Sequence, residues 1–146
     1  MRVAFEFIAT LSATLFCGAA VYINLVEHPA RLACGIGIAT KVWRPSYKRA
    51  TAMQAPLAIL GFLCGVVVWF LGGGSWWLIG ALFIGAVVPF TFLAIMPTNH
   101  RLEEPHRDRQ SDETRALLEK WGRLHAVRST LSVVASVIYV SLLVAA

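Results

Sequence analysis

Two sets of polar side chains recur at helical spacing near the two ends of this 146-residue sequence. Residues three or four positions apart share one face of a helix. The first set is Glu6, Thr10, Thr14, Cys17, Asn24 and His28. The second set is Trp121, His125, Arg128, Ser132, Ser136 and Tyr139. A helix surrounded by lipid alone has no use for such a stripe, so we expect the two stripes to face each other or a cavity.

Histidine and arginine carry most of the chemistry in these stripes. His28 and His125 are candidates for proton transfer, because histidine titrates near neutral pH. The plainer alternative for each is a hydrogen-bonded histidine at the membrane interface. Arg128 interrupts an apolar segment, where a charge is costly unless it is paired or hydrated. We expect an ion pair between Arg128 and Glu27 that orders a pocket; the alternative is an Arg128 side chain that extends to the lipid headgroups.

The same region also contains the ligand types of a two-histidine, one-carboxylate iron site, in His28, His125 and Glu27. Successive residues on a helix point about 100° apart. Glu27 and His28 could therefore bind one metal ion only if Pro29 distorts the end of the first helix. The sequence requires no cofactor, and it leaves iron, copper or haem open.

Long uncharged segments must position these residues. No Asp, Glu, Lys or Arg occurs within residues 51–99 or within residues 7–26. A helix needs about 20 apolar residues to cross a bilayer, so the longer segment holds two spans, divided by the glycine-rich turn at residues 72–75. The predicted spans are about 3–26, 52–71, 76–96 and 124–146.

The chain is therefore predicted to be all-α: an integral membrane, antiparallel four-helix bundle that forms a single domain over residues 1–146. A hydrophobic content of 58% is too high for an ordinary soluble domain. We interpret residues 1–26 as a retained helix rather than a cleaved signal peptide. Ser111 is a good N-cap, which predicts that the fourth helix begins outside the membrane and continues into the last span. In the first long loop, residues 32–43 suggest a short helix on the membrane surface that ends at residues 44–46.

The basic residues predict the orientation in the membrane. The net charge is +5, and the basic side chains gather in the loops at residues 27–51 and 97–123, whereas the turn at residues 72–75 has none. The positive-inside rule then places both long loops in the cytoplasm and both termini outside. We expect a bacterial inner (plasma) membrane. Because topology accounts for the basic residues, nucleic acid binding is not expected.

This topology brings four helix ends to one side of the membrane. Amide and aromatic side chains lie near these ends, and a flat, apolar substrate could pack against such residues. We therefore expect the following residues to bind substrate: Asn24, Tyr47, Gln54, Asn99 and Trp121.

Several motifs of this chain resemble those of the anthrone oxygenase-like family, small membrane proteins long known as a domain of unknown function. Residues 21–32, VYINLVEHPARL, are similar to the first motif of the family. Later motifs follow in the family's order: Trp43-x-x-Ser46-Tyr47, Met53-Gln54, Ile95-Met96-Pro97-Thr98-Asn99 and residues 121–128, WGRLHAVR. The resemblance covers nearly the whole chain. One departure is the segment VVPF at residues 87–90, where many relatives have a more polar sequence of the type Asn-Trp-Pro-Tyr.

The resemblance implies a four-helix membrane fold. In some members it also implies the oxidation of an anthrone to an anthraquinone by O2 without an obvious cofactor. If the segment at residues 87–90 lines the pocket, the departure there implies another substrate or none.

The favoured function is a membrane-embedded oxygenase that acts on a lipophilic aromatic or quinone-type molecule, independent of a cofactor or assisted by a metal. In this hypothesis His125 or His28 removes a proton, and Arg128 and Asn99 stabilise the resulting enolate, with Glu27 as a further catalytic residue. The alternative is a non-catalytic membrane protein that binds quinone, lipid or haem, or an accessory subunit of a larger membrane complex. A transporter is less favoured, because four spans are few. The sequence is also compatible with a homo-oligomer.

Overall fold

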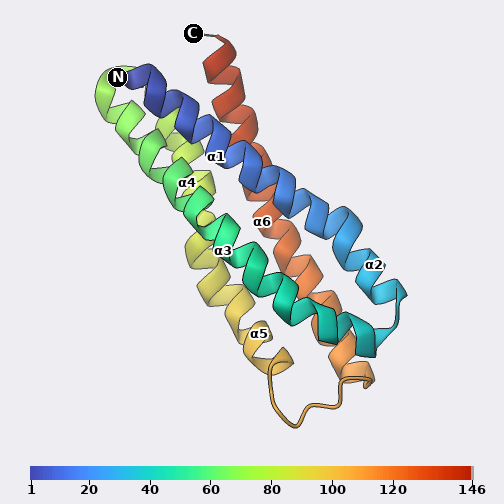
Figure 1. Ribbon diagram of the computed structural model, residues 1–146. Coiled ribbons are helices and arrows are strands. Elements are labelled where there is room, and N and C mark those ends of the chain that lie inside the picture. The colour runs from blue at the N-terminus through green and yellow to red at the C-terminus, as the bar shows by residue number, and fades with distance from the viewer. Residues whose placement is uncertain (146) are drawn as a thin grey trace.

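The computed structural model describes residues 1–145, in which the secondary structure is entirely helical (Figure 1). The helices form four long segments with the bounds 2–33, 36–73, 75–102 and 112–145, and each is long and apolar enough to cross a membrane. The protein is thus an integral membrane protein built as a four-helix bundle, as predicted. The helices extend beyond the predicted spans, and where each one enters the bilayer stays a prediction.

Short π-helical turns interrupt three of the four segments. The first segment consists of α1 (Arg2–Tyr22), the π-turn η1 (Ile23–Glu27) and α2 (His28–Ala33). The second consists of α3 (Ile36–Val68) and η2 (Trp69–Gly73). The third consists of α4 (Ser75–Phe90), η3 (Thr91–Ile95) and α5 (Met96–Leu102). The fourth is α6 (Asp112–Val144), which is continuous.

The bundle is antiparallel, and its two ends differ. Figure 1 shows both termini and the connection before α4 at one end, whereas the connection from α2 to α3 and the loop before α6 lie at the other end. The turn predicted at residues 72–75 is confirmed, because Gly72 and Gly74 have φ values of 79° and 95°, which favour glycine. The polar residues near the second end thus come from all four segments.

Two proline residues explain two of the π-turns. The residue before each proline, His28 or Met96, donates its backbone N–H to a carbonyl five residues earlier rather than four. Proline removes one helical donor, and its ring collides with the carbonyl four residues earlier. A wider turn just before Pro29 and before Pro97 relieves this collision. The extra residue in each turn changes which side chains share a face of the helix.

The first long loop differs from the prediction. A separate surface helix over residues 32–43, ending at residues 44–46, is wrong: α3 continues through Pro45, and the connection before it is only Cys34 and Gly35. The buried side chain of Trp43 packs against Trp121, with 6.0 Å between ring centroids. This tertiary contact outweighs the single backbone hydrogen bond that Pro45 removes.

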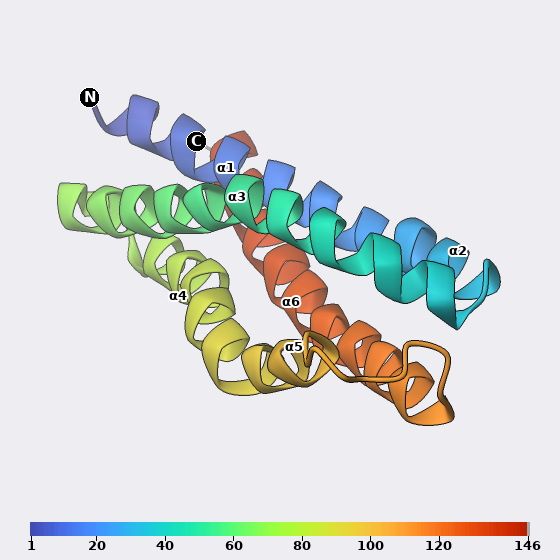
Figure 2. The same cartoon turned by 60° about the horizontal axis from the view of Figure 1, so that its bottom comes forward.

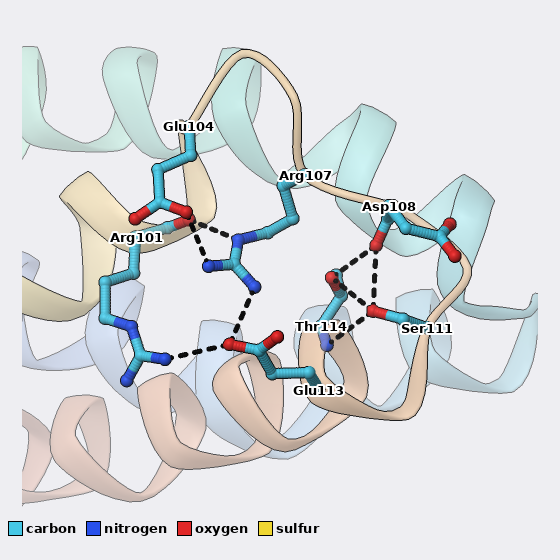
Figure 3. A network of polar contacts seen from close by, with 7 residues as sticks. All are labelled: Arg101, Glu104, Arg107, Asp108, Ser111, Glu113 and Thr114. Carbon is cyan, nitrogen blue, oxygen red and sulfur yellow. Dashed lines mark hydrogen bonds and ion pairs between the residues drawn. The ribbon is translucent and has the colours of Figure 1, made fainter.

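The start of α6 agrees with the prediction. The Ser111 side chain accepts a hydrogen bond of 3.2 Å from the backbone N–H of Thr114. The preceding loop is held by a set of ion pairs in which Arg107 is central (Figure 3). Its guanidinium lies 2.7 Å from Glu104 and 3.2 Å from Glu113, and Glu113 also pairs with Arg101 at 2.9 Å. These contacts fix the chain between α5 and α6.

Close helix packing near the other end depends on small residues. The Tyr139 hydroxyl donates a hydrogen bond of 3.0 Å to the backbone carbonyl of Gly61. A Cβ atom at Gly65 would lie 1.9 Å from the same hydroxyl oxygen. The glycine pair in α3 thus makes room for the Tyr139 side chain of α6.

Candidate functional site

A small closed cavity lies between the helices at the loop end of the bundle. Its volume is about 10 Å³, enough for about one water molecule. The lining residues are Ile23, Arg31, Ser46, Tyr47, Ala50, Thr51, Gln54, Trp121, His125 and Arg128. The predicted residues Tyr47, Gln54, Trp121, His125 and Arg128 therefore meet at one place, which we call the polar cavity.

His125 is held in one tautomer by a residue of the first segment. It is 2% exposed, and its Nδ1 atom lies 2.7 Å from the side-chain oxygen of Asn24. This amide is fixed from its other side, because its NH2 group donates to the carbonyl of Gly122 at 3.0 Å. An amide oxygen only accepts, so Nδ1 of His125 carries a proton. In the neutral form of the ring, Nε2 is therefore the one basic nitrogen.

Trp121 holds the ring of His125 from one side. The two rings stack with 4.9 Å between their centroids and an angle of 28° between their planes. Tyr47 meets Trp121 edge-on at 6.3 Å and stacks with Trp43 at 5.5 Å. Because these rings are packed on one another, His125 has little freedom to rotate.

Arg128 is a buried cation without a carboxylate partner among the residues that the structure describes. It is 6% exposed, its Nη2 atom donates to the side-chain oxygen of Gln54 at 3.0 Å, and its guanidinium lies 5.5 Å from the centre of the Phe16 ring. Its Nε atom is buried and has no hydrogen-bond partner among residues 1–145. None of the ion pairs in that part of the chain includes Arg128. Such a group has the capacity to bind an oxygen atom of a ligand.

The predicted ion pair between Glu27 and Arg128 is wrong. The Glu27 carboxylate accepts hydrogen bonds from Arg31 at 2.5 Å and from the Ser46 hydroxyl. The π-turn η1 and Pro29 shift the register of the first segment, and Arg31 lies four residues after Glu27, where a helix brings opposite charges together. Arg31 is itself 7% exposed and lines the polar cavity. In the sequence, Arg31 counts only among the basic residues that predict the orientation in the membrane. Its spacing of four residues from Glu27 is the signal that indicates the ion pair between the two.

His28 lies outside the polar cavity and joins α2 to α6. Its Nε2 atom donates to the Leu118 carbonyl at 2.9 Å, and its Nδ1 atom is buried with no partner in the described part of the chain. A Cβ atom at Gly122 would lie 2.8 Å from the His28 ring. His28 thus fills the space that the glycine leaves. Glu27, the adjacent residue, contacts α3 instead.

Asn99 is buried beside the polar cavity but does not line it. Its NH2 group and the Tyr47 hydroxyl both reach the thioether sulfur of Met96, each at 3.8 Å. The side-chain oxygen of Asn99 has no partner within the described residues. Asn99 therefore supports the Tyr47 side of the site, a connection through Met96 that the sequence pattern did not indicate.

The predicted metal ligands are not brought together. Glu27, His28 and His125 contact three different partners, and no three His, Cys, Asp or Glu side chains within residues 1–145 are grouped as a metal site. The three residues therefore do not fit the role of one ligand set. The correction follows from η1, because the turn and the 100° step between adjacent residues send Glu27 and His28 to different helices.

A second cavity lies next to the polar cavity and is almost entirely apolar. Its volume is about 90 Å³, and its lining residues are Phe16, Thr51, Ala55, Ala58, Val87, Val88, Thr91, Phe92 and Arg128. We call it the inner crevice. Thr51 and Arg128 belong to the linings of both spaces. Val87 and Val88 come from the segment in which this chain departs from the family motif.

Comparison with known proteins agrees with the resemblance noted in the sequence. Residues 43–138 match the family described as anthrone oxygenase, and they include every lining residue of the polar cavity except Ile23 and Arg31. Anthrone oxygenase tpcL of Aspergillus fumigatus is 39% identical over 70 residues, which cover 46% of this chain and 44% of that protein. The match thus spans less than half the length of this curated relative. No solved structure matches the chain. Because the family match covers more than half of the sequence, the chain belongs to the anthrone oxygenase family.

Proposed function

We propose that this protein is a membrane-embedded oxygenase that acts on a lipophilic, anthrone-type aromatic molecule. One observation carries the proposal: the neutral imidazole of His125 and the guanidinium of Arg128, which has no carboxylate partner, line the same cavity. Removing a proton from a weak carbon acid needs a base, together with a group that stabilises the enolate oxygen. Family membership supports the same reaction class.

The first step in the proposal is a proton transfer to His125. Because the ring system is too large for the polar cavity, Nε2 takes a proton from the CH2 group of the substrate through the one water molecule that this cavity can hold, and the electron pair moves through the ring system onto the carbonyl oxygen. Arg128 binds the enolate oxygen that forms. Gln54 orients Arg128, and Asn24 orients His125, through the hydrogen bonds described above.

The second step is the reaction of the enolate with O2. The former CH2 carbon forms a bond to one oxygen atom, and the other oxygen atom leaves as water when the new C=O group forms. The CH2 group supplies all four electrons that reduce O2, so one O2 yields one quinone and one water without an external reductant. His125 as the base and Arg128 as the group that binds the enolate oxygen are sufficient side chains for such a reaction.

The remaining predicted residues have positioning roles in this proposal. Glu27 holds Arg31 at the wall of the cavity, and His28 fastens α2 to α6. Asn99 supports Tyr47 through Met96. Tyr47 and Trp121 hold the His125 ring in place through the aromatic contacts described above.

We also propose that this end of the bundle faces the cytoplasm of a bacterial cell. Basic side chains flank it in α2, α3 and the loop before α6, whereas the turn at Gly72 and Gly74 carries no charge. The positive-inside rule favours this orientation.

The test is oxygen uptake by the purified protein in lipid nanodiscs after addition of anthrone. We expect uptake above the spontaneous oxidation in empty nanodiscs, with one anthraquinone formed for each O2. His125→Gln should lower the rate by at least about a hundredfold, within the range for a general base. The matched control is His100→Gln, since His100 is exposed on α5.

Two results would replace the proposal. Binding of anthraquinone without any oxygen uptake would indicate a protein that holds quinones. Finding one iron or copper atom per chain, with turnover abolished by a chelator, would indicate metal-assisted chemistry. His125 would then be a metal ligand or would have no role in the reaction.

A further inference from the structure

Two apolar hollows lie side by side between the outer surface of the bundle and Arg128. The inner crevice adjoins a groove of about 480 Å³ between α3 and α4, which we call the outer groove. The groove is lined by Ala58, Ile59, Phe62, Leu82, Gly85, Ala86, Val88 and Pro89. Ala58 and Val88 belong to the linings of both spaces. Ile59 and Leu82 are about half exposed, at 49% and 56%, so the groove opens on the surface that faces lipid.

The third segment is bent beside these two hollows. Figure 2 shows that the segment bends between α4 and α5, so that α4 and α5 point in different directions. The bend coincides with η3, the wide turn before Pro97. Gly85 lets the Phe62 ring pack closely against α4, because a Cβ atom there would lie 2.6 Å from that ring.

We propose that the inner crevice and the outer groove together bind the ring system of the substrate and admit it sideways from the bilayer. The ligand class is a planar, apolar, fused-ring molecule that carries one acidic or carbonyl oxygen at one end. The oxygen reaches Arg128 at the inner end of the crevice. This inference rests on the proposed function and adds a binding place, an access route and specificity-determining residues to it.

Charge is the first argument for such a ligand. Arg128 is the one charged residue in the lining of the inner crevice, and its Nε atom is buried without a partner within residues 1–145. A buried donor without a partner lowers the stability of the protein, and more so when it is charged. This is the cost of leaving Nε unbound. A lipid acyl chain would leave this cost in place, whereas an oxygen-bearing ring removes it. The Thr91 hydroxyl is already used, because it donates to the Val87 carbonyl at 2.7 Å.

Size is the second argument. The polar cavity holds about one water molecule, so the ring system must lie elsewhere. At about 90 Å³ the inner crevice has room for one end of a fused-ring molecule, and the remainder extends into the outer groove. Phe16 lies beneath the guanidinium of Arg128 and closes the inner end of the crevice. Val87 and Val88 then set the width of the slot, which makes them determinants of substrate choice.

The test measures binding rather than turnover. The probe is 1,8-dihydroxyanthraquinone, added to the protein in nanodiscs, with binding to empty nanodiscs subtracted. Ala55 lines the inner crevice and is exposed, so Ala55→Trp fills the crevice without disturbing the core. The matched control is Ala126→Trp, at an exposed alanine of α6 that lines none of the three spaces. We expect about tenfold weaker binding in Ala55→Trp, and a change below about twofold in the control.

A second pair of measurements tests the contact with Arg128. Arg128→Gln should weaken the binding of the dihydroxyanthraquinone about tenfold or more and leave the binding of anthracene, which has no oxygen, unchanged. Equal dye binding by wild type and Ala55→Trp would overturn the proposal and assign the crevice to lipid acyl chains. Equal losses for the dye and for anthracene in Arg128→Gln would overturn the role of Arg128 in binding the oxygen.

The outcome of these binding experiments can be distinguished from the outcome of the oxygen-uptake test of the proposed function. The expected binding pattern without oxygen uptake from anthrone would leave the ring site standing and remove the oxygenase. Oxygen uptake that is unchanged in Ala55→Trp, with unchanged dye binding, would leave the oxygenase standing and remove the ring site.

Discussion

Nδ1 of His125 lies 2.7 Å from the side-chain oxygen of Asn24, a contact that joins α6 to η1. The Ser129 hydroxyl donates to the same oxygen, and the Asn24 NH2 group is bound to the carbonyl of Gly122. The amide is therefore fixed by three contacts with one helix. It determines which nitrogen of His125 carries the proton, so a residue on η1 sets the chemistry of a residue on α6.

Replacing Asn24 tests this control of the tautomer. Asn24→Ala removes the acceptor, so that either nitrogen of His125 can carry the proton. We expect kcat for anthrone oxidation to fall about tenfold to a hundredfold, the range for loss of a group that orients a functional histidine, while KM changes by less than about twofold. A fall in kcat/KM that arises from KM alone would show that Asn24 acts on binding instead.

The contact between Gly65 and Tyr139 predicts a loss of stability on adding one methyl group. In Gly65→Ala the new Cβ would lie 1.9 Å from the Tyr139 hydroxyl, so α3 and α6 must move apart. We expect a loss of about 1–3 kcal/mol in the free energy of unfolding, the usual cost of overpacking. Thermal unfolding in detergent measures it. Gly18→Ala is the control, because a Cβ at Gly18 meets nothing within 4 Å; an equal loss in both variants would contradict the packing argument.

The cysteines allow the orientation to be tested without new residues. Cys34 is exposed at the connection between α2 and α3, Cys64 is buried, and Cys17 is only partly exposed in α1. In a bacterial host, a membrane-impermeant maleimide should label Cys34 only after the inner membrane is opened. Cys34→Ser should abolish that labelling. Labelling of Cys34 in intact spheroplasts would reverse the proposed orientation.

The contacts of Arg107 predict that the loop between α5 and α6 depends on this side chain for its ordered conformation. Its side chain is 7% exposed and contacts two glutamates and the Arg101 carbonyl. In Arg107→Ala we expect backbone amides of residues 103–111 to exchange hydrogen about tenfold faster, because the contacts that hold the loop closed are lost. Arg109→Ala, at an exposed arginine outside the ion pairs, should leave exchange unchanged. Equal effects of the two variants would mean that general charge, rather than this network, orders the loop.

Much of the architecture follows from the sequence because its signals are local. The absence of charge over residues 51–99 predicts two spans, the glycines near residue 73 predict the turn, and Ser111 predicts the start of α6. The spacing of His125 and Arg128 places both on the inner face of α6, and both line the polar cavity. These features depend on composition and on helical periodicity.

The partners of Glu27 and His28 could not be predicted in the same way. The sequence predicts a regular helix through residue 26. The structure has one extra residue in the turn η1, which changes the direction of every later side chain relative to Thr10 and Thr14. The continuous α3 depends on the tertiary contact between Trp43 and Trp121, which local sequence does not reveal. The inner crevice depends likewise on the bend at η3.

The lone guanidinium of Arg128 has a consequence for turnover in the proposed reaction. An enolate carries a full negative charge that the neutral starting ketone and the neutral quinone product lack, so Arg128 attracts the intermediate more strongly than either. Arg128 therefore binds the enolate most tightly, and its hold on the ligand weakens when the neutral quinone forms. A quinone still binds through its oxygen but less tightly than the enolate, so the product returns to the bilayer more readily than the intermediate does.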